Sequence, residues 1–375
     1  MEQNDITIIG AGFAGLACAR RAASQGMRTA VLERKPCPGA NIRTTGILVK
    51  EAADLLNLPS HLSRHISGVR LYSPNGKWID LSSPGYSFVA TDTPGMMRWL
   101  MQKAESAGAE VRLSQNVSQF QMEESNVLLP EAGIISRFLV GCDGARSNVA
   151  RKFGLSSNRD FLMGAEAEYV GIDGLEQDKL HVFLDSKLAP GYIGWIVPGV
   201  GISQVGIAVR SPHKPDLRAF EAKIAKLIDF SKAKVIGRRG GLIPCGGVLK
   251  HWYTDRVMLL GDAAGMVSPL TAGGIYPSLE LGANAGISIS HYLQGKISDP
   301  VEDILAMVPR YGVKGMMRWS MDHLSPPNAL YNLALGNPVF RRIAQVLFFH
   351  HRGLFCAQAW KDILHMGNTS ADVTG

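Results

Sequence analysis

The chain has 375 residues, of which 46% are apolar and 19% charged, so a disordered or low-complexity protein is excluded. It has 39 Lys and Arg against 32 Asp and Glu, a net charge of +7 that suits an anionic cofactor, an anionic substrate or a membrane surface. No basic stretch is interleaved with aromatic residues as in nucleic-acid sites, so no nucleic-acid partner is expected. Five cysteines without a CxxC pair predict neither a disulfide framework nor a metal site, and favour a reducing, cytoplasmic location.

The first residues predict neither a signal peptide nor a membrane span. No charged region precedes an apolar one at the N-terminus. The most apolar stretch, residues 191–209, contains Pro198 and several glycines, which favours two buried strands and a turn.

The first fifty residues predict a dinucleotide-binding unit. Ile6–Ile9 predicts a strand, and the sequence GAGFAG follows it at Gly10–Gly15. Leu16–Gln25 predicts a helix, and Thr29–Leu32 predicts a second strand that ends at Glu33. A GxGxxG motif between a strand and a helix, with an acid about 20 residues further on, is typical of dinucleotide binding.

Each residue of this motif has a physical role. Gly10 allows the tight turn, Gly12 lets the backbone approach a pyrophosphate, and Gly15 lets the helix pack closely on the strand. The helix N-terminus offers free N–H groups to the phosphates. Glu33 can bind an adenosine ribose and disfavours a 2′-phosphate, which favours FAD or NAD over NADP, although Arg34 next to it weakens this argument.

Two later strands also end in acids. The strand that begins at Phe138 leads into Asp143-Gly144, and the strand that begins at Val257 leads into Gly261-Asp262. An acid just past a strand can bind a ribityl hydroxyl. The glycine-rich segment before the next helix can place N–H groups against a flavin pyrimidine edge, where the helix N-terminus would stabilise negative charge.

The remaining segments predict a helix from Thr93, a strand at 109–113 and, in the middle of the chain, a sheet. Its four strands are punctuated by Gly and Pro and lie at Ala165–Val170, Leu180–Leu184, Ile193–Val197 and Gln204–Val209. Beyond Gly295 the chain is expected to be helical, with apolar helices at Val339–His350 and Leu354–Met366 that either pack on the core or lie on a membrane surface.

The three glycine-containing motifs, in this order, resemble those of the FAD-dependent oxidoreductases with a para-hydroxybenzoate hydroxylase-like fold, over residues 5–290. A nicotinamide dehydrogenase is the alternative. The resemblance implies an α/β protein, α+β overall: a Rossmann-like FAD-binding domain with an inserted antiparallel substrate sheet and a C-terminal helical region. The expected boundaries are 1–70, 95–160 and 250–295 for the FAD-binding domain, 71–94 and 161–249 for the sheet, and 296–375 for the helical region.

The resemblance also implies which residues bind FAD. It places Arg98 near the pyrophosphate and Val117 near the adenine, and Arg43 is a further candidate for contact with the cofactor. The full set of expected cofactor-binding residues is Gly10, Gly12, Ala14, Gly15, Glu33, Arg34, Arg43, Arg98, Val117, Asp143, Gly144, Gly261, Asp262, Gly273, Gly274 and Ile275.

Pro190–Pro198, PGYIGWIVP, resembles the PGGYGWxFP stretch of geranylgeranyl reductases, whose substrates are prenyl chains. The segment Gly261–Tyr276, which contains Asp262, also resembles that family, because aromatic hydroxylases more often have His where this chain has Gly265. Trp195, Tyr192 and Tyr276 are therefore candidates to line a substrate pocket beside the flavin. Archaeal members carry a cysteine near the flavin where this chain has Arg43-Thr-Thr-Gly46, so no mechanism through that thiol is implied.

Three functions remain open. The first is C=C reduction in an isoprenoid or similar lipid by hydride from N5 of reduced FAD, so that the flavin itself is the catalytic group. The second is a monooxygenase that uses a flavin C4a-hydroperoxide; the likeness of the Trp195 segment to the WxWxIP stretch of halogenases makes halogenation a weaker variant. The third is a non-catalytic flavin-binding sensor. The expected electron donor is NAD(P)H or a ferredoxin-like redox partner, and the C-terminal helices could make peripheral membrane contact.

Overall fold

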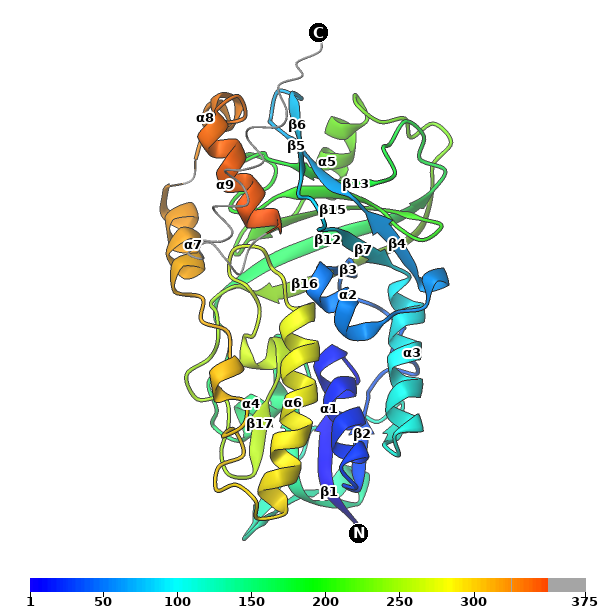
Figure 1. The fold of residues 1–375 in the computed structure, drawn as a ribbon, viewed down its shortest axis with the longest axis vertical. Coiled ribbons are helices and arrows are strands. Elements are labelled where there is room, and N and C mark those ends of the chain that lie inside the picture. Colours follow the sequence, from blue (N-terminus) through cyan, green and yellow to red (C-terminus); the bar gives the residue numbers. More distant parts are fainter. Residues whose placement is uncertain (325, 350–375) are drawn as a thin grey trace. The chain divides into compact units, whose positions relative to one another are not determined.

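The computed structural model describes residues 1–324 and 326–349. The chain forms two compact units, each assembled from three segments (Figure 1). The first unit comprises 1–63, 91–164 and 239–320; the second comprises 64–90, 165–238 and the described residues from Met321 to Phe349. The expected C-terminal region is thus divided at Met321. The helix expected at Leu354–Met366 lies outside the described residues.

The first unit contains a Rossmann-like sheet. Its strands are β1 (Glu2–Ile9), β2 (Thr29–Leu32), β8 (Glu110–Arg112), β9 (Gln121–Glu123), β10 (Asn126–Leu129), β11 (Ile134–Gly141) and β17 (Val257–Leu259). Their order is β8-β2-β1-β11-β10-β9, and β17 also pairs with β11. The pairs β2–β8, β1–β2, β1–β11 and β11–β17 are parallel, while β9 and β10 extend the sheet as an antiparallel meander.

Helices α1 (Phe13–Ser24) and α6 (Ile275–Leu293) pack against each other through small residues, and Figure 1 shows them side by side. A Cβ on Gly282 would lie 2.5 Å from the Ala14 carbonyl oxygen, and one on Gly286 would lie 2.4 Å from that of Cys18. These residues are four apart on each helix and so share one face. The glycines therefore let the two helix backbones approach closely.

The first unit also contains α3 (Thr93–Ser106), whose N-terminus is capped by Asp92. Its shorter elements are β3 (Ile47–Leu48), α2 (Lys50–Leu56), η1 (Ser60–Leu62), η2 (Pro130–Ala132), α4 (Asn148–Lys152), η3 (Gly261–Ala264) and η4 (Leu305–Met307). Helix α7 (Gly312–Leu324) begins in this unit and ends in the second.

The second unit is built on another seven-stranded sheet. In spatial order, its strands are β16 (Lys234–Pro244), β12 (Phe161–Val170), β15 (Ser203–Arg210), β14 (Gly194–Pro198), β13 (Lys179–Phe183), β5 (Gly68–Tyr72) and β6 (Trp78–Ser82). Strands β4 (Ser63–Ile66) and β7 (Phe88–Thr91) pair with each other. The pairs β5–β6, β13–β14 and β14–β15 are antiparallel as expected, but β5 and β13 are parallel. Because much of the first unit separates these two strands in sequence, the chain is long enough to return in the same direction.

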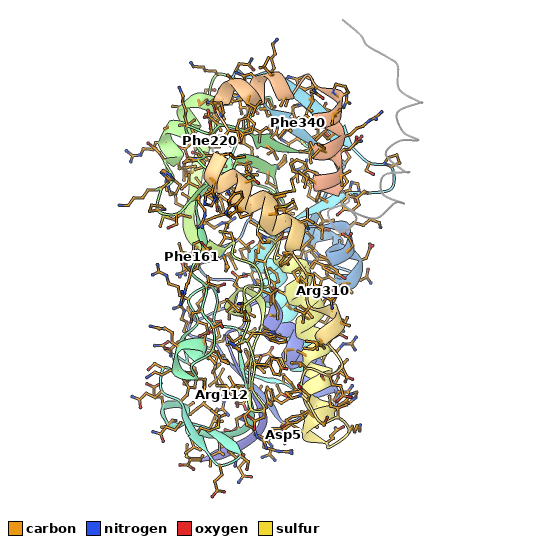
Figure 2. All side chains as sticks on the ribbon, turned by 90° about the vertical axis from the view of Figure 1, so that its left-hand side faces the viewer. Asp5, Arg112, Phe161, Phe220, Arg310 and Phe340 are labelled. Atoms are coloured by element: carbon orange, nitrogen blue, oxygen red, sulfur yellow. The ribbon has the colours of Figure 1, made fainter. Side chains whose placement is uncertain are left out.

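Helix α5 (Leu217–Ile224) covers one face of this sheet. The ring of Phe220, labelled in Figure 2, packs on Gly194, where a Cβ would lie 2.4 Å from it. The apolar core here includes Tyr72, Tyr169, Phe183, Ile196, Val205, Ile207, Phe220 and Ile224. Helices α8 (Asn328–Ala334) and α9 (Pro338–Phe349) complete the described part, and α9 confirms the helix expected from Val339 as far as Phe349.

Residues 1–324 and 326–349 contain neither a membrane-spanning helix nor a cluster of metal-ligand side chains. None of their helices is both long enough and apolar enough to span a membrane. Nowhere in this part do three or more His, Cys, Asp or Glu residues group as metal ligands would.

Candidate functional site

The glycine-rich turn and the segments that carry Glu33, Asp143 and Asp262 all begin beside one row of residues across the first sheet. Ile9 is in register with both Leu32 and Gly141, and Gly141 is in register with Leu259. Because these strands are parallel, the segments that follow them lie at the same carboxyl edge, where ligands bind in open α/β sheets. The glycine-rich turn and the segments of the three acids are therefore brought together in space.

The turn between β1 and α1 fits a phosphate. Gly10 has a φ of 103°, and a Cβ there would lie 2.4 Å from the Cys142 carbonyl oxygen. A Cβ on Gly15 would lie 2.1 Å from the Gly10 carbonyl oxygen, whereas one on Gly12 would meet no atom within 4 Å. No side chain caps α1, and its first turn, which includes Ala14, has no acid. The open space beside Gly12 and the uncapped N–H groups together suit an anionic group.

Glu33 is held in a fixed orientation at the end of β2. Its side chain is 7% exposed, and its two oxygens accept hydrogen bonds from the Ala11 N–H at 2.8 Å and the Lys35 N–H at 3.0 Å. A carboxylate oxygen has more than one acceptor position, so Glu33 can still accept from ribose hydroxyls. Arg34 is exposed beside it.

The chain after β8 runs along the Glu33 segment. The Gln115 N–H donates to the Glu33 carbonyl at 2.9 Å, and the Ser114 N–H donates to that of Lys35 at 3.0 Å. Val117, two residues further on, is 7% exposed. This placement suits the expected apolar contact with an adenine, which stays a prediction.

Asp143 has a structural role that its sequence motif did not indicate. Its Oδ2 accepts from the N–H groups of Asn148 at 2.6 Å and Val149 at 3.1 Å, at the start of α4. Its Oδ1 is buried and accepts no hydrogen bond from the described residues. Gly144 has a φ of 87° and open space where a Cβ would be. A hydroxyl of the cofactor is the kind of donor that this unsatisfied oxygen lacks.

Asp262 lies at the start of η3, in a turn that contacts both α1 and α6. A Cβ on the preceding Gly261 would lie 3.2 Å from the Ala14 Cβ, so α1 packs directly on this turn. Burial raises the pKa of the Asp262 carboxyl to about 6. The side chain of Asn158 donates to the carbonyls of Ala145 at 3.1 Å and Asp262 at 2.8 Å, and thereby joins the two acid-containing turns. Sequence reasoning missed Asn158 because no motif marks it.

The segment that leads into α6 presents an uncapped helix N-terminus. The Ser268 N–H donates to the Gly273 carbonyl at 3.1 Å, and Ala272 between them has a φ of 53°. Gly274 is the N-cap residue of α6 and Ile275 its first residue, and no side chain caps this end. The free N–H groups suit the acceptor atoms of a flavin pyrimidine edge.

Two exposed arginines of the first unit lie near the loop that follows Glu33. A Cβ on Gly39 of that loop would lie 3.1 Å from Nη1 of Arg98. The methylene groups of Arg43 pack at Gly241, where a Cβ would lie 3.4 Å from the Arg43 Cβ. Burial lowers the pKa of Lys35 in the same loop, Glu33 opposes this, and the charges of Arg43 and Arg34 add to the lowering. The cofactor contacts of Arg98 and Arg43 stay predictions.

The three pocket candidates are not all in one unit. Trp195 and Tyr192 belong to the second unit, whereas Tyr276 lies in the first turn of α6 and its hydroxyl donates to Glu280. The Trp195 indole N–H donates to Glu166 at 2.8 Å, on the sheet face opposite the α5 core. Glu166 is 5% exposed, and sequence reasoning missed it because only the strand register reveals this pair.

Comparison with known proteins identifies the chain as an FAD-dependent oxidoreductase. A family model described as FAD dependent oxidoreductase matches residues 5–70. The solved structure of a geranylgeranyl bacteriochlorophyll reductase-like protein from Thermoplasma acidophilum has the same fold, with a TM-score of 0.79 at 19% identity over 98% of this chain and 100% of that one.

Two curated relatives identify the family. Digeranylgeranylglycerophospholipid reductase 2 of Methanopyrus kandleri is 30% identical over 306 residues, which cover 75% of this chain and 76% of that protein. Digeranylgeranylglycerophospholipid reductase of Methanocaldococcus jannaschii is 26% identical over 333 residues, 85% of each chain. The chain belongs to the digeranylgeranylglycerophospholipid reductase family, and its cofactor is FAD.

Proposed function

We propose that this protein reduces C=C bonds in the geranylgeranyl chains of a glycerophospholipid or of a closely similar isoprenoid lipid. The observation that carries the proposal is membership of a family whose curated relatives are named for reduction of such a lipid. When bound and reduced, FAD supplies the hydride.

The residues of the first unit have distinct roles in this proposal. The open space at Gly12 and the N-terminus of α1 bind the pyrophosphate, and Glu33 orients the adenosine ribose. The carboxylates of Asp143 and Asp262 accept hydrogen bonds from the ribityl hydroxyls or from hydroxyls next to them. The N-terminus of α6 holds the pyrimidine edge, where its positive dipole end favours a reduced, negatively charged ring.

The substrate-facing wall is assigned to the sheet face that carries Trp195. On this face Trp195 is in register with Val182 on one side and Gly206 on the other. A Cβ on Gly206 would lie 2.4 Å from the indole ring, so the glycine leaves room for the ring to lie flat on the sheet. The hydrogen bond to Glu166 fixes the ring's orientation. Tyr192 and Tyr276 remain candidate substrate contacts.

The electron donor, the location and the membrane contact are finer parts of the same proposal. We take NAD(P)H or a ferredoxin-like protein as donor. The described cysteines Cys18, Cys37, Cys142 and Cys245 are free thiols, which supports a reducing, cytoplasmic location. A substrate with two long prenyl chains resides in a bilayer, which supports peripheral membrane contact.

An anaerobic spectrum of the bound flavin tests the proposal. The full chain is purified with FAD, reduced under argon and mixed with digeranylgeranylglycerophospholipid in detergent; the saturated lipid of the same headgroup is the matched control. We expect the unsaturated lipid alone to reoxidise the flavin, with loss of C=C bonds measured by mass spectrometry.

Two other outcomes would contradict the proposal. If neither lipid reoxidises the flavin, and oxygen uptake is instead coupled to hydroxylation of the lipid, the protein is a monooxygenase. If no donor reduces the bound flavin at a rate useful for turnover, the protein is a non-catalytic flavoprotein.

A further inference from the structure

Helices α8 and α9 expose an unusual concentration of large apolar side chains. Leu330 and Leu333 of α8 are 51% and 76% exposed, and Val339 at the start of α9 is 62% exposed. Leu324, at the end of α7, is 72% exposed. Single exposed apolar residues are ordinary, but several on adjoining elements mark an interaction surface. We call these four residues the apolar tip.

The outward orientation of the two α8 leucines of the apolar tip is fixed by polar contacts on the opposite side of that helix. Asn328 accepts from the Ser186 N–H at 2.8 Å and donates to Asp185 at 2.9 Å, and Asn332 accepts from the Asn75 N–H at 3.1 Å. Residues four apart share a helix face, so Asn328 and Asn332 both face the protein. Leu330 and Leu333 are therefore turned outward by the same contacts that hold the helix in place.

Positive charge accompanies the apolar tip. From His323 to Phe349 the sequence contains no Asp or Glu, and the preceding Asp322 is paired with Arg210 at 3.0 Å. The two arginines of this stretch, Arg341 and Arg342, are both exposed on α9. The guanidinium of Arg341 also donates to the Asp80 carbonyl at 3.3 Å, which places α9 along β6. Phe340, between Val339 and these arginines, is labelled in Figure 2.

The neighbouring strands do not offset this positive charge. Lys77 is exposed on the turn between β5 and β6, the turn that Asn75 joins to α8. The carboxylate of Asp80 is already paired with Arg70 at 2.8 Å and with Lys179. Among residues 326–349, exposed apolar side chains are thus accompanied by cations and by no acid, a combination that complements an anionic lipid surface.

We infer that the apolar tip and the arginines of α9 dock the protein onto an anionic lipid bilayer, with the leucines in the headgroup region. The inference rests on the proposed function, since a bilayer-resident substrate requires access to its membrane. Buried apolar area and electrostatic attraction act together in this kind of binding, and the second is weakened by salt.

Co-sedimentation with vesicles tests this inference. The full chain with FAD is mixed with vesicles of phosphatidylglycerol and phosphatidylcholine in equal parts, or of phosphatidylcholine alone. We expect binding to the first that declines with salt, and much weaker binding to the second. Leu330→Ser/Leu333→Ser should reduce binding about tenfold or more, because two exposed leucines lose their apolar contact. Arg342→Gln should reduce it about fivefold on the anionic vesicles only.

Matched variants control for loss of folding and for general surface effects. Leu55→Ser changes a leucine of α2 that is 54% exposed, and Lys296→Gln removes an exposed cation of the first unit. Both should bind as the unaltered protein does. Equal binding by the leucine double variant would overturn the inference. So would absence of binding by the unaltered protein, including the case where sedimentation shows that the apolar tip joins two copies of the chain.

The outcome for the proposed function is read separately, from reduction of a detergent-dispersed lipid, which needs no bilayer. The double variant should retain that rate and lose activity only on vesicle-embedded substrate. Vesicle binding without any lipid reduction would overturn the proposed function alone, and reduction without vesicle binding would overturn the docking surface alone.

Discussion

Gly12 and Gly15 lie in the same turn, but a methyl group on each would meet different surroundings. At Gly12 the methyl enters open space at an ordinary φ of −81°. Gly12→Ala should therefore leave the stability of the apoprotein within about 0.5 kcal/mol, yet weaken FAD binding about tenfold or more because the methyl occupies the space of the pyrophosphate. Titration of the apoprotein by flavin fluorescence and its thermal unfolding measure the two effects.

Gly15→Ala is the matched control for that substitution. Its methyl would lie 2.1 Å from the Gly10 carbonyl oxygen, so the apoprotein should lose about 2 kcal/mol or more of stability. Equal destabilisation by both variants, with equal FAD affinity, would show that the open space at Gly12 is not the phosphate site.

Asp262 gives a pH-dependent prediction. Its pKa is raised to about 6 in the folded protein, against 3.8 for the free side chain, so the folded state favours the protonated form. The stabilisation that this form provides is complete below the pKa of the unfolded chain and is lost as the pH rises through about 6. The apoprotein with Asp262→Asn should thus be more stable than the unaltered one at pH 7.5 by about 3 kcal/mol, the equivalent of this pKa shift.

Urea unfolding of the two apoproteins from pH 5 to 8 measures this difference. The advantage of Asp262→Asn should shrink towards pH 5, and a constant difference across the range would contradict the pKa assignment. FAD affinity should fall in the variant at pH 7.5, where Asp262 is ionised, because an amide offers one acceptor oxygen where the carboxylate offers two.

The sequence predicted the residues that follow a strand and carry a recognisable motif, such as Glu33 and Asp262. It could not predict Asn158 or Glu166, since their roles depend on which carbonyl or indole lies opposite them in the fold. Nor did it show that Asp143 binds the start of α4, because the Asp-Gly motif suggested only a ligand. What escapes prediction is therefore contact between segments that are distant in sequence.

At the scale of elements, the contact between α1 and α6 positions the phosphate turn against the turn of Asp262. A Cβ on Gly286 would lie 2.4 Å from the Cys18 carbonyl oxygen, which belongs to the rigid backbone of α1. Gly286→Ala should therefore destabilise the protein by about 1–3 kcal/mol through overpacking. Differential scanning calorimetry of the apoprotein measures this change.

A glycine-to-alanine substitution in α7 should have the opposite effect on the stability of the protein. Gly315 lies inside that helix and has no atom within 4 Å of a Cβ position. Gly315→Ala should stabilise by up to about 1 kcal/mol, since alanine is the better helix former. If both variants were stabilised, the close approach of α1 and α6 would be disproved.

Strand β16 shows why an element escapes sequence analysis. Its sequence, KVIGRRGGLIP, combines charges and glycines that favour a turn. In the fold, Gly240 packs closely against the neighbouring strand β12, where a Cβ on it would lie 2.9 Å from the Gly164 carbonyl oxygen. β16 is an edge strand of its sheet, so several of its side chains are exposed, and it lacks the apolar runs punctuated by Gly and Pro that predicted β14 and β15.

At the scale of the whole molecule, the order of segments couples the stability of the two units. The chain passes between them after Ser63, Ala90, Gly164, Arg238 and Ser320. Cleaving the polypeptide at any one position would therefore not separate one unit from the other. Unfolding the first unit releases the ends of every segment of the second, which should make the two unfold together rather than as independent domains.

Binding of FAD to the first unit should therefore stabilise both. At a free FAD concentration 100 times Kd, ligand linkage adds about 2.7 kcal/mol to the free energy of unfolding. Hydrogen exchange measured by mass spectrometry should show this gain in the slowest amides of β1 and also in those of β14 and β15, which belong to the second unit. The control is Gly12→Ala at the same FAD concentration, in which the gain should be smaller in both units. Protection gained in β1 alone would show that the second unit unfolds independently despite the interleaved chain.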